Sequence, residues 1–391
     1  MNRQLKDLFD VVQLSSITGN VAPSSDHVVA YCTDVPELIN RIKRSRPPVD
    51  DFVVKIGIDG GRSFFKITLS VISPQMEHLA GFKDGGVKKL FIIALSPNLA
   101  EKYDNISPVW TKLLKLHELE YLVAGDLKII NIIIGIMAHS SKNPCPYCEA
   151  LKSELGVANG TARTKGSINE NCTRKKKLNG KNFASCVNAP LVSGSDEDKI
   201  VNLCPPPPLH ITLGIINTIF KSLEKKAPDW VDLWVEQAQV RHQQMTYGFT
   251  GRACHALLDA TNCLADNPEL SDYVTVLNNF KNVYAKCFSF KLEHGFEEAI
   301  ADFASSWEKL NLPFTSKYHI TKYHVADFCR EAGRGLGLHN EQASESVHAD
   351  FDVIWQRYKA PKSSKVYNDR LLNSLIDYTA TICNQGKNAK K

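Results

Sequence analysis

Four residues of the types that bind zinc stand in two short pairs far apart in the sequence. Cys145 and Cys148 form a C-x-x-C, and His319 and His324 form an H-x4-H, a gap found in structural zinc sites. Two thiolates and two imidazoles complete a tetrahedron around Zn²⁺. A single C-x-x-C also occurs in redox motifs or by accident, and histidines are often simply buried. Our interpretation is a zinc site that joins the start of a long insertion to its end.

Two aspartates stand at the ends of apolar runs typical of buried strands. Asp59 ends the run 52–58, and Asp126 follows the run 120–124. Strand ends of open α/β sheets are where ligand sites gather, and two carboxylates there can bridge a pair of divalent cations. An Asp before Gly is also a common turn residue, and Asp126 could equally cap a helix. Each aspartate alone leaves both alternatives open.

A third carboxylate for such a site would have to come from the helix expected after residue 339. Glu345, in the segment 342–348, is the best candidate. Glu341 lies one turn earlier on the same helical face, so spacing alone does not exclude it.

The elements that must position these residues follow from hydrophobic periodicity. Strands are predicted at 52–59, 64–72, 90–95 and 120–124, and helices at 109–119 and 127–137. Residues 155–200 are rich in Gly, Asn, Ser and Lys and indicate surface loop, and the pattern from 209 to about 312 is helical. We therefore expect a mixed α/β core interrupted by a long, mainly α-helical insertion. We expect five parts: an N-terminal remnant or linker (1–50), the first part of the core (51–150), the insertion (151–318), the segment that completes the core (319–360), and a helix with a basic tail (361–391).

Composition excludes several classes of protein. The chain has 391 residues, 43% hydrophobic and 23% charged, which is typical of globular proteins and argues against wholesale disorder. The sequence contains no P-loop, nucleophile elbow or dinucleotide-binding fingerprint. The most apolar stretch, 129–137, is too short to span a membrane. The net charge is +5, but basic residues gather at 41–46, 174–177 and 387–391, typical of nuclear-localisation signals, phosphate contacts or merely solvated loops.

In the order and spacing of these motifs, the sequence resembles the catalytic core of the Transib transposases and of the V(D)J recombinase catalytic subunit. Asp59 is followed by two glycines, Asp126 precedes the C-x-x-C by the interval of that family, and the histidine gap matches. Glu345 lies in the expected Ala-Ser-Glu-Ser context. The resemblance covers roughly residues 50–360, and the Chapaev and other CACTA-related transposases share a similar layout.

This resemblance implies a ribonuclease-H-like fold and a DDE-type DNA transposase or recombinase, an endonuclease that also transfers strands. Its catalytic triad would be Asp59, Asp126 and Glu345, holding two Mg²⁺ or Mn²⁺ ions, and its structural Zn²⁺ would bind Cys145, Cys148, His319 and His324. The implied partners are double-stranded DNA at transposon or recombination-signal ends, a second copy of the chain and an accessory subunit, with the nucleus as location.

The family also implies domains before the first Asp that bind terminal repeats and dimerise, whereas only residues 1–50 precede the core here. We therefore interpret the chain as a truncated copy, a partial gene model or a domesticated derivative. Two alternatives stay open. One is a catalytically silent, transposon-derived DNA-binding or scaffold protein, and the other is an unrelated zinc-stabilised α/β protein.

Overall fold

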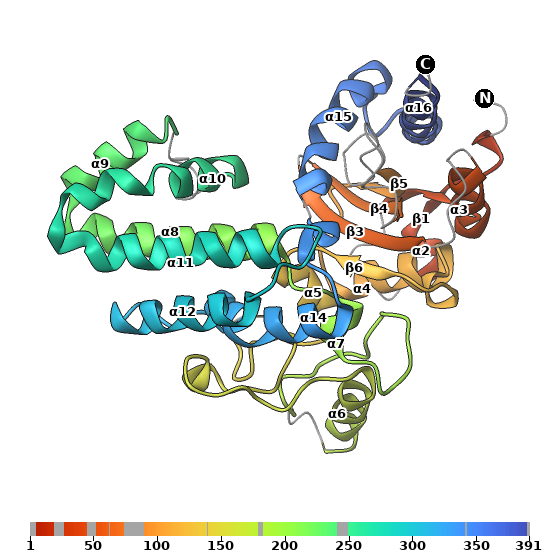
Figure 1. Ribbon diagram of the computed structural model, residues 1–391. Helices are drawn as coiled ribbons and strands as arrows, with labels where there is room; N and C mark the ends of the chain where they lie inside the picture. Colours follow the sequence, from red (N-terminus) through yellow and green to blue (C-terminus); the bar gives the residue numbers. More distant parts are fainter. Residues whose placement is uncertain are drawn as a thin grey trace. The chain divides into compact units, whose positions relative to one another are not determined.

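The computed structural model describes residues 5–18, 27–44, 52–61, 63–73, 90–138, 140–178, 183–240, 249–340 and 342–388. Within these ranges, side chains are not described for 61, 342–346 and 384–388. The chain forms two compact units (Figure 1). We call them the sheet unit, residues 1–138, 164–198 and 341–391, and the helical unit, residues 139–163 and 199–340. The chain therefore passes between the two units four times.

The sheet unit is built on a six-stranded mixed sheet with the order β1-β2-β5-β4-β3-β6. Its strands are β1 (Phe9–Gln13), β2 (Val28–Cys32), β3 (Val53–Gly61), β4 (Phe64–Ile72), β5 (Phe91–Pro97) and β6 (Leu122–Ala124). Neighbouring strands are antiparallel except β3 and β6, which run parallel. The mixed α/β class expected from the sequence is thus confirmed.

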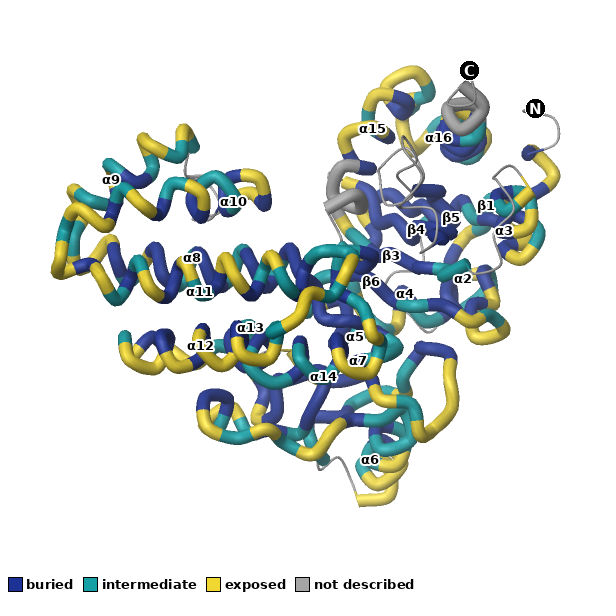
Figure 2. The backbone as a smooth tube through the Cα atoms, in the orientation of Figure 1, coloured by how far each residue is buried: buried dark blue, intermediate teal, exposed yellow. Residues whose placement is uncertain are grey.

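The central strands β4 and β5 are buried at every residue, and Figure 2 shows them in the dark blue of buried backbone. Because successive side chains of a strand point to opposite faces, complete burial means that both faces of the sheet are covered. The β-branched and aromatic residues in these runs suit that environment. Ser63, just before β4, takes the left-handed conformation, with φ 69°.

The described residues of the first fifty, 5–18 and 27–44, do not form a linker. They contribute β1 and β2 to the sheet, together with α2 (Leu14–Thr18) and α3 (Val35–Arg44). α3 is strongly amphipathic and buries Val35, Leu38, Ile39 and Ile42. The expectation of a linker was wrong because β1 and β2 are only five residues long, and such short strands leave a weak periodic signal.

Two helices from the end of the chain complete the sheet unit, α15 (Gln342–Tyr358) and α16 (Tyr367–Asn388). They pack against each other, α15 also against β3 and α16 against β1, β2 and β5 (Figure 1). Phe64 at the start of β4 contacts Phe351 and Trp355 of α15 edge to face, with ring centroids 5.2 and 5.3 Å apart. The Tyr378 hydroxyl of α16 donates to the Leu90 carbonyl at 3.1 Å.

Residues 164–198 also belong to the sheet unit, not to the helical insertion in which the sequence analysis put them. They contain α6 (Lys165–Lys177), capped by the Thr164 side chain. Their later part is tied to the sheet unit because the Trp110 indole N–H donates to the Leu191 carbonyl at 3.0 Å. Composition suggested loop because α6 carries few apolar residues.

Between β5 and the end of α5 the predicted helices are partly displaced. Instead of one helix at 109–119 there are α4 (Tyr103–Pro108), a π-helical turn (Val109–Leu113) and a 3₁₀ turn (Leu116–Glu118). Lys115 ends the helical run in the left-handed conformation, with φ 48°. α5 (Leu127–Ile134) starts as expected and stops at Gly135, with φ 78°.

The helical unit contains α7 to α14. Their bounds are α7 (Ile200–Leu203), α8 (Pro208–Lys226), α9 (Pro228–Gln237), α10 (Gly251–Asp259), α11 (Ser271–Cys287), α12 (Phe296–Lys309), α13 (Ser316–His319) and α14 (Val325–Ala332). Aromatic side chains fill the core between α11, α12 and α13, where Trp307 stacks on Tyr318 with centroids 5.1 Å apart. In the described parts of the chain, no helix has the length and apolar character needed to cross a membrane.

Candidate metal centre

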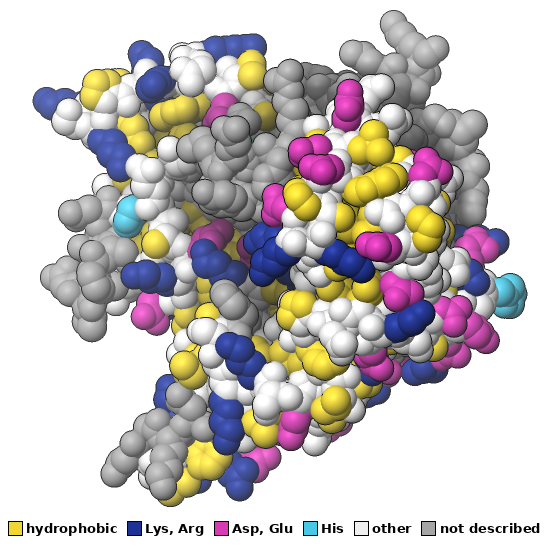
Figure 3. Space-filling model, turned by 90° about the vertical axis from the view of Figure 1, so that its left-hand side faces the viewer, with side chains coloured by type: hydrophobic (Ala, Val, Ile, Leu, Met, Phe, Trp, Pro, Cys, Tyr) yellow, Lys and Arg dark blue, Asp and Glu magenta, His cyan; other side chains and the backbone are white. Residues whose placement is uncertain are grey.

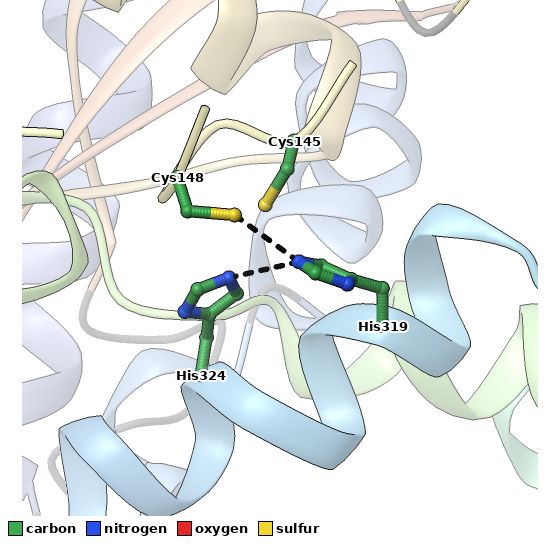
Figure 4. A group of neighbouring side chains, drawn as sticks. All are labelled: Cys145, Cys148, His319 and His324. Carbon is green, nitrogen blue, oxygen red and sulfur yellow. Dashed lines mark hydrogen bonds between the residues drawn. The ribbon is translucent and has the colours of Figure 1, made fainter. Parts of the chain in front are cut away.

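The two cysteines and two histidines predicted as zinc ligands lie together in the helical unit (Figure 4). One ligand atom of each residue lies within 4.8 Å of those of the other three, and all four residues are buried. Cys148 Sγ and His319 Nε2 are 3.2 Å apart, as are the Nε2 atoms of His319 and His324. Zn–S bonds of about 2.3 Å and Zn–N bonds of about 2.0 Å place tetrahedral ligand atoms roughly 3.3–3.8 Å apart. The cluster could therefore hold a metal ion such as zinc.

A tight backbone knuckle presents the two cysteines. The Tyr147 amide donates to Cys145 Sγ at 3.4 Å, and Cys148 pairs with Ala162 in an isolated antiparallel bridge. The Arg163 amide donates to the Tyr147 carbonyl at 2.8 Å. The knuckle is thus folded back on residues 161–163, which fixes both sulfur atoms.

A π-helical turn, Ile320–His324, brings the two histidines together. Residues five apart in an α-helix point roughly 140° away from each other, because each residue turns the helix by about 100°. A π-helical turn closes with i→i+5 hydrogen bonds and has more residues per turn, so such residues come to the same side. Here the Val325 amide bonds the Ile320 carbonyl, five residues back. The H-x4-H spacing therefore works as a ligand pair through this local departure from α-helix.

Hydrogen bonding sets which nitrogen of His319 is available. Its Nδ1 lies 2.9 Å from the Leu155 carbonyl oxygen, which can only accept, so Nδ1 carries the proton. Nε2 then presents its lone pair toward Cys148 and His324, as a metal ligand must. On His324, Nδ1 faces Asp327 Oδ2 at 3.6 Å, a second partner typical of metal-binding histidines.

The surroundings of the cluster favour ionisation of one cysteine thiol, that of Cys148. A hydrogen bond from Cys145, with further contributions from both histidines, holds the pKa of Cys148 far below its ordinary value. Burial and the neighbouring Cys148 raise the pKa of Cys145. Burial lowers the pKa of His324, but Asp327 and Cys148 outweigh burial and raise it. Cys148 is thus the thiol that ionises more readily, and a bound cation would favour the ionised form of both.

Arg163 is a further residue of this centre that sequence patterns did not single out. It is fully buried, with no exposed surface. Its Nε lies 3.0 Å from both the Cys145 and Cys148 carbonyl oxygens, and Nη2 lies 3.3 Å from the Asn143 carbonyl. The guanidinium therefore clamps the backbone of the knuckle beside the thiols. No spacing rule places a lone arginine there.

Asp59 and Asp126, the two predicted catalytic aspartates, lie at equivalent positions of neighbouring strands in the sheet unit. The parallel pairing of β3 with β6 ends at Gly57 opposite Ala124, and each aspartate stands two residues further on. Asp59 is still within β3 and does not form a turn. Asp126 follows β6 and caps α5, because its Oδ1 accepts from the Ile129 amide at 2.7 Å. The helix-cap alternative is thus correct for Asp126, although the cap leaves its second oxygen available.

Asp59 is bonded by a histidine that the sequence analysis did not single out. His348 Nε2 of α15 lies 2.7 Å from Asp59 Oδ2, and His348 Nδ1 lies 2.5 Å from Lys66 Nζ. A second acidic residue, Glu101, accepts from the Gly60 amide at 2.8 Å and also pairs with Lys128. Glu101 therefore joins the segment after β5 to the end of β3 and to α5.

The third predicted carboxylate is only partly located. Residue 345 belongs to α15, but its side chain is outside the described part, and Glu341 lies outside the described residues altogether. Within the described part of the chain, the Cys/His cluster is the only group of three or more metal-binding side chains close enough to share an ion. Convergence of the three carboxylates stays a prediction.

On the face drawn in Figure 3, charged side chains of the two signs are not strongly segregated. Lysine and arginine side chains are scattered over the face drawn in Figure 3, with acidic side chains among them. The basic run 174–177 occupies the last turn of α6. There its positive charges favour the negative end of the helix dipole, which is a structural reason for them apart from any ligand.

Comparison with known proteins identifies one match. Residues 21–154 match a family described as a domain of unknown function (DUF8703), about a third of the chain. The match includes Asp59, Asp126 and both cysteines, but neither histidine. No curated protein matches the chain. The match therefore assigns no chemistry to these residues.

Proposed function

We propose that the chain is the catalytic core of a DDE-type DNA transposase or recombinase. Asp59, Asp126 and Glu345 would hold two Mg²⁺ or Mn²⁺ ions. The observation that carries the proposal is the equivalent placement of Asp59 in β3 and of Asp126 just after β6, each two residues beyond the last pair of these adjacent parallel strands. Adjacent strand ends are where two carboxylates can bind a pair of cations together.

The topology of the sheet supports a ribonuclease-H-like core, as the resemblance implies. β3, β4 and β5 form an antiparallel meander, and β6 joins the free side of β3 in parallel. The first aspartate is on the first strand of the meander and the second directly follows the parallel strand. In this proposal β1 and β2 extend the sheet beyond β5.

The position of α15 supports Glu345 as the third carboxylate. α15 packs on β3, and its His348 bonds Asp59. Position 345 is three residues before His348, and residues three apart share a helical face. Position 341 is seven residues before His348, roughly 10 Å away at the rise of an α-helix, so we favour Glu345 over Glu341.

The roles of the residues follow from two-metal chemistry. The carboxylates would act as ionised ligands that only accept, holding a scissile phosphate between them through the cations. Two cations bound there would lower the pKa of an attacking water and stabilise the leaving 3′ oxygen. In a second step the freed 3′-OH would attack another phosphodiester and displace the 3′ oxygen of that strand as the leaving group, which gives a hairpin or strand transfer.

We propose a structural role for zinc at Cys145, Cys148, His319 and His324. Four protein ligands leave no open position for a substrate. The cysteines lie near the beginning of the helical unit and the histidines near its end, so zinc would close that unit on itself. The proposed partners are double-stranded DNA, a second copy of the chain and an accessory subunit, and the proposed location is the nucleus.

Metal-dependent nicking tests the proposal. Supercoiled plasmid is incubated with the zinc-loaded chain and Mn²⁺, and nicked product with a 3′-OH is quantified. Asp59→Ala should abolish nicking, whereas Asp104→Ala, an exposed aspartate of the same unit, should leave it unchanged. Glu345→Gln should abolish nicking and Glu341→Gln should not. Equal nicking by the wild type and Asp59→Ala would exclude this catalytic site.

The second candidate is a DNA-binding protein without catalysis. The capping role of Asp126 favours it, because that carboxylate has a structural task whether or not metal binds. This candidate predicts binding to duplex that weakens steeply with salt, and no nicking in either cation. An absence of DNA binding at low salt would exclude both candidates and favour an unrelated zinc-stabilised protein.

A further inference from the structure

Two buried basic side chains and Asp59 form one hydrogen-bonded chain. Lys66 of β4 is directly opposite Asp59 of β3 in the antiparallel pairing, and only 1% of its surface is exposed. His348 of α15 is 5% exposed and lies between them. Asp59 itself is more open, with 33% of its side chain accessible. The hydrogen-bonded chain therefore begins in the protein interior, at Lys66, and ends at the solvent-accessible carboxylate of Asp59.

Chemistry fixes the direction of the two hydrogen bonds. A carboxylate only accepts, so His348 Nε2 carries a proton and donates to Asp59 Oδ2 at 2.7 Å. With Lys66 in its ordinary ammonium form, Nδ1 is the acceptor of the second bond, from Lys66 Nζ at 2.5 Å. A neutral imidazole thus joins a buried cation to the carboxylate, and its tautomer is determined from both sides.

Lys66 is held in place by more than this bond. Its Nζ lies over the Phe64 ring, 5.4 Å from the centroid, and over the Phe351 ring at 5.2 Å. Aromatic faces stabilise an ammonium group that burial deprives of water. Burying an ion costs free energy that only well-placed partners offset.

We propose that His348 and Lys66 are positioning residues that hold Asp59 for cation binding. His348 fixes the plane of the carboxylate through Oδ2 and leaves Oδ1 for a divalent cation, while Lys66 fixes the tautomer of His348. Outer hydrogen bonds of this kind orient metal ligands, and their loss typically weakens metal affinity or activity about 10- to 100-fold. The inference rests on the proposed function, since it takes Asp59 as a metal ligand.

The proposal also limits which cation binds. With a proton on Nε2, His348 has no lone pair directed at the site and does not ligate. The protein ligands of the cations would then be carboxylate oxygens only, which suit Mg²⁺ and Mn²⁺ better than softer metals.

A glutamine at position 348 provides a sharp test. The amide of glutamine carries an acceptor and a donor on one short fork, so it can accept from Lys66 and donate to Asp59, whereas leucine can do neither. Mn²⁺ affinity of the zinc-loaded full chain is measured by electron paramagnetic resonance. His348→Leu should weaken Mn²⁺ binding about 10- to 100-fold. His348→Gln should restore it to near the wild-type value, and Lys66→Met should fall between them. Val347→Ala, a buried neighbour on α15, is the packing control and should bind normally.

The outcomes separate this inference from the proposed function. Asp59→Ala with unchanged Mn²⁺ affinity would overturn the metal site and with it the inference. Asp59→Ala without binding, combined with normal binding by His348→Leu, would overturn the inference alone. If His348→Leu does not fold, ¹⁵N shifts of the wild-type imidazole decide instead. The proposal requires the Nε2–H tautomer at His348 in the wild type, and an Nδ1–H tautomer would refute it.

Discussion

Arg163 offers a direct test of how the cysteine knuckle is held. Replacing it by methionine keeps most of the side-chain volume and removes the guanidinium. The change takes away the donors to the carbonyls of Asn143, Cys145 and Cys148, all of which belong to buried residues. The polypeptide path between the two thiols would then lose its clamp.

The expected magnitude follows from these bonds. Nε–H is shared by two carbonyls and Nη2 serves the third, so the change removes at least the two donors that hold these three carbonyls. Hydrogen bonds from charged groups contribute about 1.5–3 kcal/mol each. Relief from burying the charge offsets part of this, so we expect a net loss of about 2–4 kcal/mol. If the loss falls entirely on the zinc-bound state, zinc binding weakens by about 30-fold to several hundred-fold.

Competition with a chromophoric zinc chelator measures the affinity, and thermal melting measures stability. For a unit of this size, 3 kcal/mol corresponds to a fall in melting temperature of roughly 6–12 °C. Arg252→Met is the matched control, because Arg252 is exposed in α10 of the same unit. It should change stability by less than about 0.5 kcal/mol. Zinc affinity and melting temperature of Arg163→Met within error of the control would refute the clamp.

Two further predictions concern the ligands and the sheet unit. Cys145→Ser should reduce bound zinc from about one per chain to none, as measured by inductively coupled plasma mass spectrometry. It should also lower the melting temperature as a chelator does, because structural zinc contributes folding free energy; unchanged stoichiometry would contradict the site. Trp110→Phe removes the indole donor to the Tyr121 hydroxyl and the Leu191 carbonyl, at 3.0 Å each. We expect a loss of about 2–4 kcal/mol and faster proteolysis within residues 183–198, and unchanged cleavage there would show that another contact holds this segment.

The Cys/His cluster could be predicted from sequence because its ligands occur as two pairs with short, characteristic spacings. Cys145 and Cys148 are close neighbours in the chain, and so are His319 and His324, and the structure brings the two pairs together. Arg163 could not be predicted in this way. Its role depends on backbone carbonyls that converge only after the knuckle has folded, and carbonyls are present at every position.

The same distinction applies to the sheet and its carboxylates. The long strands β3 and β4 were predicted within a residue or two, because each is a long apolar, β-branched run. β1 and β2 were missed because five-residue strands at the side of a sheet rely on neighbours that are distant in sequence. The bond between Asp59 and His348 joins positions 289 residues apart, and nothing local to either residue indicates it. Glu345 stays a prediction.

The distance along the chain between the paired cysteines and histidines has a consequence for biosynthesis. When Cys148 leaves the ribosome, His324 is still 176 residues away. At roughly 5–20 residues per second, the second pair follows on the order of ten to thirty-five seconds later. Until then Cys145 and Cys148 are a free dithiol, open to oxidation or to capture by other metals. A nascent chain that terminates before His319 could never complete the site, so metal loading would report that synthesis has passed this point.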